Sequence, residues 1–508
     1  MPSAQVSRDC TIRIGEPTPR SSLSPHMFGL FFEHWAKILY EGIWDLERNT
    51  LRSDVLAATR ALRPTILRYP GGLYANSYHW RDGVGPREQR PTHPARDWKL
   101  YTALPGISED IARRFVRPEP NAFGTDEYLS YCDDLGARPA LTVNVATGTP
   151  EEAADWVAYT KGRVKHWFIG NELYLPESPW NVHQFSPEEY AETFGTFATA
   201  MRKVDPELTL IAVGCLPRDG AALGFEDWSP RVMKSAESQI DMLSLHFYFP
   251  GFIGRPLEHS EADYLQLATA GDRFEGELDR LSASIGEEVP LSIDEWSLWS
   301  EMPQLLETNH SLTDAAFFAS MFNSFIRRSG TIKLAMLSQF VNCLGPIQTR
   351  GDRMFTTAAY LVALLYREHS GSQVLHVETE SERFHVPSFD KAEKTDTLQQ
   401  VFDDSETASV TPLRDDPLES SRIDAVATLQ GDEVALFLSN RSLHAPATIE
   451  VDGVAESGRL RWLDGDGPFT RNDVSNPWRL HIAERAVTTS SFDLPPHSVG
   501  VLLTSRSR

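Results

Sequence analysis

The chain has 508 residues, 41% of them apolar and 23% charged, which is ordinary for a globular protein and enough for a large barrel plus a second domain. Its 48 basic and 71 acidic residues give a net charge of −23, and such a surface repels nucleic acid and anionic membranes while it suits a neutral substrate. No run approaches the roughly 18 apolar residues of a membrane span, so we expect neither a membrane nor a nucleic-acid partner.

The N-terminal segment contains one short alternating pattern. Cys10, Ile12 and Ile14 alternate with polar residues, which predicts a strand within residues 1–20 that joins the second domain. The segment has no apolar stretch typical of a secretory signal, so we expect a cytoplasmic protein. The four cysteines are far apart in the sequence and are expected to be reduced and buried.

Residues 21–370 alternate between short apolar runs and amphipathic segments, the rhythm of parallel strands joined by helices. Candidate strands lie near residues 27, 65, 140, 166, 208, 241, 290 and 334, and two of the clearest helical patterns begin near 188 and 314. Eight strands close a (β/α)8 TIM barrel, so we predict an α/β fold. The long connection after the second strand includes residues 99–118 and would lie on the active-site face.

Two of these apolar runs end in a carboxylate. HWFIGNE ends in Glu172, and PLSIDEW places Glu295 at the end of its run, 123 positions later. At roughly 40 residues for each strand and helix, that separation is three units of a barrel, so both acids would lie on one rim. Paired carboxylates about 5–5.5 Å apart are what retaining glycoside hydrolysis needs, one as acid/base and one as nucleophile.

Other predicted strands also end in polar side chains, which together predict a site at this rim: Glu33, His34, Arg68, Asn144, His246 and Tyr248. Two histidines raise the question of a metal, but the sequence has no HExxH motif and no close His/Cys cluster, so we expect no metal. Gly71 and Gly72 form no GxGxxG motif, and we expect no nucleotide and no other cofactor.

After residue 370 the character of the sequence changes. Residues 374–421 are rich in charged residues, Ser, Thr and Pro, which predicts a linker or irregular excursion. The remaining runs are short, alternating and separated by Gly, Asp and Pro, so residues 371–508 are predicted to form a β-sandwich domain.

Several motifs in a fixed order resemble the α-L-arabinofuranosidases of glycoside hydrolase family 51: FGLFFEH, YEGIWD, LRYPGG, YHWRDGVGP, NAFGTDEYLSYC, FIGNE, SLHFY, IDEW and SQFVNCLGPI. The resemblance spans about residues 26–350, and later segments resemble that family's C-terminal domain. It implies a retaining exo-acting hydrolase that releases terminal α-L-arabinofuranosyl groups, as in arabinan degradation. It also implies a jelly-roll-like C-terminal sandwich, no cofactor and a homo-hexamer.

The resemblance also implies roles for individual residues. Glu172 would be the general acid/base and Glu295 the nucleophile. Asn171 would bind the 2-hydroxyl of the sugar. The residues implied or proposed to bind or surround the substrate are Glu33, Arg68, Asn76, Asn171, His246, Tyr248 and Trp296.

The chain departs from the family pattern beside this site. Leu73 stands where the family often has an asparagine that contacts the sugar, and Asn76 would replace that contact only if the loop is rebuilt. Residues 99–118 and much of 374–421 resemble insertions, and the stretch after Pro346 is unlike the family's usual continuation. These departures leave open a galactofuranosidase, a xylosidase or an endo-glucanase of the same fold. A non-catalytic carbohydrate-binding protein is a further alternative, although it would not need two acids on one rim.

Overall fold

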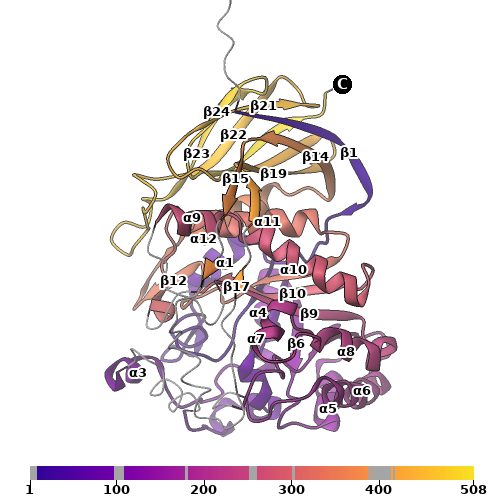
Figure 1. Cartoon of the computed structure of the whole chain (residues 1–508). Coiled ribbons are helices and arrows are strands. Elements are labelled where there is room, and N and C mark those ends of the chain that lie inside the picture. The colour runs from indigo at the N-terminus through magenta and orange to yellow at the C-terminus, as the bar shows by residue number, and fades with distance from the viewer. Residues whose placement is uncertain are drawn as a thin grey trace, which may run out of the picture.

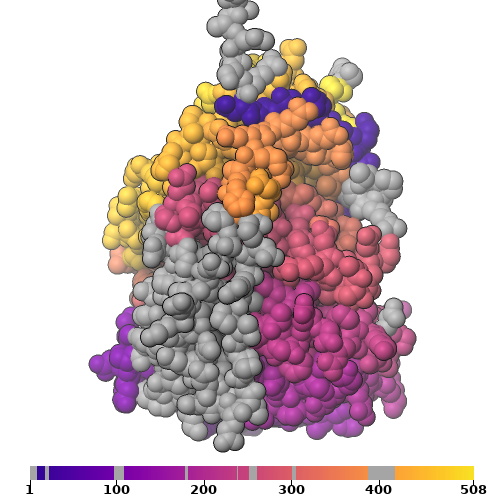
Figure 2. All heavy atoms as spheres, viewed as in Figure 1, coloured from indigo at the N-terminus to yellow at the C-terminus, as the bar shows by residue number. Residues whose placement is uncertain are grey.

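The computed structural model describes residues 9–95, 108–177, 181–250, 260–299, 304–386, 389–390, 414–415 and 418–507. Figure 1 shows two regions, a barrel surrounded by helices and a β-sheet domain above it. The sheet domain contains the C-terminal part of the chain together with an N-terminal strand. In the space-filling view, the indigo N-terminal residues accordingly lie at the same end of the molecule as the yellow C-terminal ones (Figure 2).

The barrel is closed and has eight parallel strands, which confirms the predicted fold and all eight candidate strands. Around the ring their order is β10, β11, β2, β5, β6, β7, β8 and β9. In chain order they span Gly29–Phe31 (β2), Ile66–Tyr69 (β5), Arg138–Val143 (β6), His166–Ile169 (β7), Thr209–Val213 (β8), Met242–Phe249 (β9), Leu291–Leu298 (β10) and Ile332–Leu337 (β11).

Helices follow the strands on the outside of the barrel, and the two helices predicted near 188 and 314 are present as α6 and α11. The α-helices are Ser53–Leu62 (α1), Glu109–Phe115 (α3), Thr125–Leu135 (α4), Pro150–Thr160 (α5), Pro187–Val204 (α6), Pro217–Ala222 (α7), Trp228–Ala236 (α8), Glu261–Ala268 (α9), Ala270–Ile285 (α10), Ala315–Arg327 (α11) and Ala358–His369 (α12). Short 3₁₀ helices span Leu73–Ser77 (η1), Trp80–Gly83 (η2), Arg87–Gln89 (η3), Glu237–Gln239 (η4) and Gln304–Glu307 (η5).

Helix α6 illustrates how the sequence fixes these boundaries. The Ser186 hydroxyl accepts a hydrogen bond from the Glu189 backbone, and the Glu189 side chain accepts one from the Ser186 backbone, which forms a capping box. Pro187 occupies the first turn, where its missing N–H costs nothing, and Arg202 and Lys203 face the negative end of the helix dipole.

The interior of the barrel is packed with side chains and is not a pore. One buried cluster takes its members from nearly every strand: Phe31, Ile66, Ala140, Phe168, Ile211, Met242, Leu334 and Met336. Since apolar side chains fill this layer, polar side chains are expected at the carboxyl ends of the strands, where the loops open the barrel.

The second domain is built on a nine-stranded sheet with the order β23, β22, β25, β20, β19, β14, β1, β21 and β24. Buried side chains from strands far apart in this order share one core, among them Ile12 in β1, Leu436 in β20, Leu460 in β22 and Phe492 in β24. The sheet therefore folds over into two layers, as in a β-sandwich. Its strands are Cys10–Ser22 (β1), Gln373–Ser381 (β14), Ile423–Gln430 (β19), Glu433–Asn440 (β20), Ala447–Asp452 (β21), Ser457–Asp464 (β22), His481–Thr488 (β23), Phe492–Leu494 (β24) and Val499–Ser505 (β25).

The prediction of an irregular segment from residue 374 is wrong at its start. Residues Gln373–Ser381 form β14, which pairs antiparallel with both β1 and β19. The remaining described strands form two-stranded pairs: Trp44–Asp45 (β3) with Thr50–Leu51 (β4), Ile347–Arg350 (β12) with Arg353–Thr356 (β13), Arg383–Val386 (β15) with Leu418–Ser421 (β18), and Phe389–Asp390 (β16) with Arg414–Asp415 (β17). Residues 391–413 of the predicted excursion, and 99–107 of the predicted insertion, lie outside the described residues.

The sheet domain packs against α11 and α12 of the barrel (Figure 1). Tyr366 on α12 stacks on Phe437 of β20 with ring centroids 4.2 Å apart, and Arg327 on α11 forms an ion pair of 2.7 Å with Asp424 on β19. The boundary at residue 370 stays a prediction; it falls between the end of α12 and the start of β14. Among the described residues, no helix is long and apolar enough to cross a membrane.

Candidate active site

The predicted rim residues come from three barrel strands and from the loops that follow barrel strands. Arg68 lies in β5, His246 and Tyr248 lie in β9, and Glu295 lies in β10. Glu172 and Asn171 follow the end of β7, Glu33 and His34 follow β2, Asn76 follows β5 and Asn144 follows β6, whereas Trp296 lies within β10. Because all these strands are parallel, their ends meet on one face of the barrel.

Arg68 is fully buried and organises the floor of the site. Its guanidinium contacts Glu295 Oε1 at 2.7 Å, Asp294 Oδ2 at 3.1 Å, Asn171 Oδ1 at 2.6 Å and Thr142 Oγ1 at 3.1 Å. Burial alone would lower the pKa of Arg68, but the two carboxylates outweigh it and raise the pKa. The guanidinium therefore stays charged and fixes the orientation of Glu295.

Tyr248 holds the second oxygen of the same carboxylate. Its hydroxyl donates to Glu295 Oε2 at 2.7 Å and lies 2.6 Å from Ser338 Oγ. Burial and the charge of Glu295 raise the pKa of Tyr248 well above its ordinary value, so it remains a neutral donor. Arg68 and Tyr248 thus hold Glu295 from two sides.

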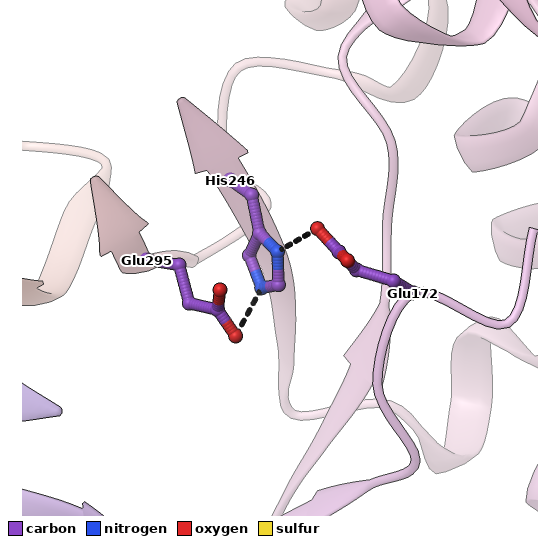
Figure 3. A group of neighbouring side chains, drawn as sticks. All are labelled: Glu172, His246 and Glu295. Atoms are coloured by element: carbon purple, nitrogen blue, oxygen red, sulfur yellow. Dashed lines mark hydrogen bonds and ion pairs between the residues drawn. The ribbon is translucent and has the colours of Figure 1, made fainter. Parts of the chain in front are cut away.

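His246 lies between the two carboxylates that the sequence predicted to be catalytic (Figure 3). Its Nδ1 is 2.7 Å from Glu172 Oε1, and its Nε2 is 3.4 Å from Asp294 Oδ2 and 3.7 Å from Glu295 Oε1. Burial alone would lower the pKa of His246, but the surrounding carboxylates outweigh it and raise the pKa to about 10. His246 is therefore an imidazolium at neutral pH.

Glu172 sits in an unusual backbone conformation at the end of β7. Its φ is +46°, in the left-handed region that residues with a Cβ rarely adopt, and Gly170, two residues earlier, has φ +83°. Burial raises the pKa of Glu172, and the charge of Glu295 acts in the same direction. Contacts with His246 oppose this shift but do not cancel it. The carboxyl group is thus favoured as a proton donor.

The loop after β5 brings the main chain close to the carboxylates of Glu33 and Glu295. Gly72 N–H donates to Glu33 Oε2 at 3.1 Å, and the other oxygen of Glu33 accepts from Gln339 Nε2 at 2.8 Å. A Cβ at Gly72 would lie 2.7 Å from Glu295 Oε1, so only glycine permits this approach. Gln339 has no strong local signal in the sequence, since it lies just beyond the end of β11.

Two asparagines lie side by side at the rim. Asn171 accepts from Arg68 through Oδ1, while its Nδ2 is buried without a hydrogen-bond partner among the described residues. Asn76 is fully buried and donates from Nδ2 to the main-chain oxygen of Asn171 at 2.8 Å. Asn171 therefore has a donor to offer to a ligand, whereas the donor of Asn76 is engaged with the backbone and its Oδ1 is buried without a hydrogen-bond partner among the described residues.

Trp296 does not join the other predicted residues. Its ring is buried against Phe322 and Phe325 of α11, each with a centroid distance of 5.1 Å, on the outer side of the barrel wall. The prediction that it binds substrate is therefore not supported by its position. Trp299, three residues later, is half-buried and lies edge-on to Tyr248 with ring centroids 5.2 Å apart.

A register shift in β10 explains why the adjacent residues Asp294 and Glu295 both reach the site. The pairing of β10 with β9 is irregular between Ser292 and Glu295, which marks a bulge. Because of it, Asp294 and Glu295 both face the barrel interior, where Asp294 contacts Arg68. Simple alternation along the strand would have placed only one of the two acids inside. Asp294 was therefore overlooked as a site residue, although its position before Glu295 was a signal.

The histidine at the end of the first strand has a structural role. His34 Nδ1 is 2.8 Å from Glu119 Oε2, its Nε2 is 2.8 Å from the Tyr69 hydroxyl, and its ring stacks on Tyr74. Both ring nitrogens are thus engaged away from the catalytic carboxylates.

Three side chains in the site lie close enough together to surround a cation. One ligand atom each of Glu172, His246 and Glu295 lies within 4.8 Å of the others. Because His246 carries a positive charge, its ring is a poor metal ligand in this state. The absence of a metal stays a prediction.

Two family models match the chain. The α-L-arabinofuranosidase 1 domain matches residues 58–251, and the α-L-arabinofuranosidase C-terminal domain matches residues 294–498. The first range contains Glu172 and the second begins one residue before Glu295.

Known proteins are similar over most of the chain. The probable α-L-arabinofuranosidase C of Aspergillus clavatus is 30% identical over 401 residues, covering 69% of this chain and 72% of that protein. An intracellular exo-α-(1→5)-L-arabinofuranosidase of Streptomyces lividans is 27% identical over 436 residues, covering 77% of this chain and 62% of that protein.

The fold is shared as well. The structure of the thermostable family 51 α-L-arabinofuranosidase from Thermotoga petrophila RKU-1 superposes with a TM-score of 0.76 at 25% identity, covering 98% of this chain and all of that one. Together with the sequence matches, this confirms the resemblance read from the motifs. The chain belongs to the α-L-arabinofuranosidases of glycoside hydrolase family 51 and is a glycoside hydrolase.

Proposed function

We propose that this enzyme is a retaining exo-glycosidase that releases terminal α-L-arabinofuranosyl groups from arabinose-containing saccharides. The observation that carries the proposal is the spacing of the two acids, since an oxygen of Glu172 and one of Glu295 lie within 4.8 Å. Retaining enzymes hold their carboxyl groups about 5–5.5 Å apart, whereas inverting enzymes leave roughly 6.5–9.5 Å for a water molecule. Exo-action is supported by the name of the Streptomyces relative.

The two carboxylates have different surroundings, which supports different roles. Glu295 is held by Arg68 and Tyr248 and is the nucleophile. In the first step its oxygen bonds to the anomeric carbon, the bond from that carbon to the leaving oxygen breaks, and Glu172 gives its proton to that oxygen. In the second step Glu172 takes a proton from water, the water oxygen bonds to the anomeric carbon, and Glu295 leaves as a carboxylate.

The charges of the site remain balanced through both steps. Arg68 and His246 carry positive charges and Asp294 a negative one. The proposed mechanism starts with Glu295 as a carboxylate and Glu172 protonated, and the raised pKa of Glu172 supports the latter. Formation of the ester removes the charge of Glu295 while loss of a proton gives Glu172 a charge. Because the imidazolium of His246 lies between these two groups, it stabilises the negative charge at either place. In this proposal His246 therefore acts on the carboxylates more than on the sugar.

The remaining contacts would bind the sugar. Asn171 Nδ2 is the donor available to the 2-hydroxyl, and Glu33 is placed to accept from other hydroxyls. Trp299 replaces Trp296 as the aromatic residue proposed to border the pocket. We also propose a cytoplasmic location, supported by the intracellular Streptomyces relative, and a homo-hexamer, carried over from the resemblance.

The proposal is tested with nitrophenyl glycosides of arabinofuranose, galactofuranose, xylose and cellobiose. We expect kcat/KM on the α-L-arabinofuranoside to exceed that on the others by at least about tenfold, because a sugar that leaves buried polar groups unpaired loses transition-state binding. Proton NMR should detect the α-anomer as the first product, and arabinan should release single arabinose units. A preference for another glycoside would overturn the proposed substrate. Release of the β-anomer as the first product would overturn the retaining mechanism, and binding without turnover would favour the carbohydrate-binding alternative.

Leu73 gives a second test of the substrate. It is half-buried, packs against the barrel core and follows Gly72 beside Glu295. An unpaired buried polar group costs about 1–3 kcal/mol, so if an arabinofuranose hydroxyl lacks a partner here, Leu73→Asn should raise kcat/KM on the arabinofuranoside by roughly 5- to 150-fold. Leu73→Ala is the control, because it removes the apolar side chain without adding an amide. A fall on every glycoside with Leu73→Asn would mean that Leu73 serves loop packing.

A further inference from the structure

The 3₁₀ helix η1 forms part of the rim next to both catalytic carboxylates. It begins at Leu73, directly after the glycine that approaches Glu295, and it contains Asn76. Asn76 is 0% exposed although it lies in a surface loop, and a buried polar side chain normally has a defined partner. That partner identifies what the side chain does.

The amide nitrogen of Asn76 has one partner, a main-chain oxygen, and the amide oxygen has none among the described residues. Its Nδ2 donates at 2.8 Å to the main-chain oxygen of Asn171, and this carbonyl belongs to the peptide that carries the nitrogen of Glu172. Glu172 has φ +46°, a conformation that an L-residue keeps only where its surroundings hold it. Asn76 therefore fixes the orientation of the peptide plane between residues 171 and 172. This orientation determines the direction in which the Glu172 side chain leaves the backbone.

The helix η1 is itself anchored to the next loop of the barrel. Thr147 Oγ1 donates to the main-chain oxygen of Asn76 at 3.2 Å, and Asn144 Nδ2 donates to the main-chain oxygen of Tyr78 at 3.3 Å. Asn144 also accepts from the Thr147 backbone at 2.9 Å. The loops after β5, β6 and β7 are thus joined in sequence, and Asn76 is the side chain that makes the last connection.

We propose that Asn76 is a positioning residue for proton transfer, which sets the place of Glu172 by holding the 171–172 peptide. This rests on the proposed role of Glu172 as acid/base. It differs from the sugar contact predicted for Asn76 from the sequence, because the side chain is fully buried and its amide nitrogen is already engaged. A group that fixes an acid, and not the sugar, should affect only substrates that need the acid.

The test compares Asn76→Ala with the wild-type enzyme on a series of aryl α-L-arabinofuranosides that runs from dinitrophenyl to unsubstituted phenyl. The quantity is kcat/KM, which reports the glycosylation step. Displacement of a general acid is expected to cost roughly 10- to 100-fold on the phenyl substrate, which needs protonation. The loss should be less than about threefold on the dinitrophenyl substrate. The inhibition constant of free arabinose should not change.

Two further variants complete the experiment. Asn76→Asp keeps the shape but replaces the donor with an acceptor, so it should show the same dependence on the leaving group. Ser77→Ala removes a hydroxyl from the same turn that donates to the Tyr74 carbonyl and not to Asn171, so it should behave as wild type.

The outcomes separate the possibilities. Equal losses along the series together with weaker arabinose inhibition would show that Asn76 binds the sugar. Unchanged kinetics with a lowered Tm would show that it contributes only to stability, and either result overturns the proposal. If the wild-type enzyme prefers another glycoside, the proposed substrate fails, and the aryl series is then made from that sugar so that the role of Asn76 is still decided.

Discussion

Replacing Glu295 with alanine is expected to lower kcat on nitrophenyl α-L-arabinofuranoside by a factor of at least about 10⁴, comparable to the loss of other enzyme nucleophiles. Arg68 and Tyr248 hold both oxygens of this carboxylate, so the wild-type group is placed for attack and its loss removes the nucleophile. The variant should still bind arabinose. Added azide can enter the space left by the side chain and attack from that face, so any azide product should have the inverted configuration and the normal retained product should not return.

The neighbouring carboxylate supplies a matched control. Asp294→Asn changes a group that contacts Arg68 and His246 but has no place in the bond-forming step, so its loss should be clearly smaller than that of Glu295→Ala. Wild-type turnover by Glu295→Ala, or an azide product of retained configuration, would remove Glu295 from the role of nucleophile.

The barrel could be predicted from the sequence because each of its strands is a short apolar run that stops at polar residues. HWFI in β7 is the clearest case, since the strand ends at Ile169 and the turn that follows delivers Glu172. In a parallel barrel every such end lies on the same face, so the eight strand ends were enough to predict the site. That argument needs only the pattern along the chain.

Asp294 shows where such a pattern fails. Alternation along β10 depends on an uninterrupted register, and the bulge before Glu295 changes which side chains face inward. No residue in this stretch indicates a bulge from the sequence, because Ile293 and Trp296 are both typical of a regular strand. Asp294 was therefore overlooked, whereas Trp296, which directly follows the inward-facing Glu295, faces α11 as regular alternation requires.

The strand β14 was overlooked for a different reason. Apart from the buried Leu375, its residues alternate between half-buried and exposed positions, and His376, Glu378 and Glu380 give it the polar composition of a linker. It is stabilised by pairing with β1, which lies more than 350 residues earlier in the chain. Pairings over such separations leave no local signal. The same holds for the contact of His246 with Glu172, which only the closed barrel creates.

Replacing Glu172 with alanine is expected to separate substrates by their need for a proton. On arabinosides with poor leaving groups the loss should be roughly 10²- to 10⁴-fold, the usual contribution of general acid catalysis, whereas glycosylation by dinitrophenyl α-L-arabinofuranoside should be much less affected. The vacated space lies on the side of the leaving group, so azide should restore turnover of the activated substrate and give a product of retained configuration. This is the opposite of the result expected for Glu295→Ala, and the two variants are therefore controls for each other.

The pH dependence of activity is an independent test of Glu172 as the general acid. The wild-type enzyme needs Glu172 protonated at the start, and burial raises the pKa of this carboxyl above its ordinary 4.5, so the active form persists to higher pH than for an exposed glutamate. Activity should fall as the pH rises through the pKa of Glu172, and this basic limb should disappear in Glu172→Ala on the dinitrophenyl substrate. The measurement is kcat/KM against pH for both proteins. A basic limb that survives in the variant would mean that another group donates the proton, and equal losses on activated and natural arabinosides would mean the same. His246 would then be the first residue to test, because its Nδ1 is 2.7 Å from Glu172 Oε1 and its pKa is raised to about 10.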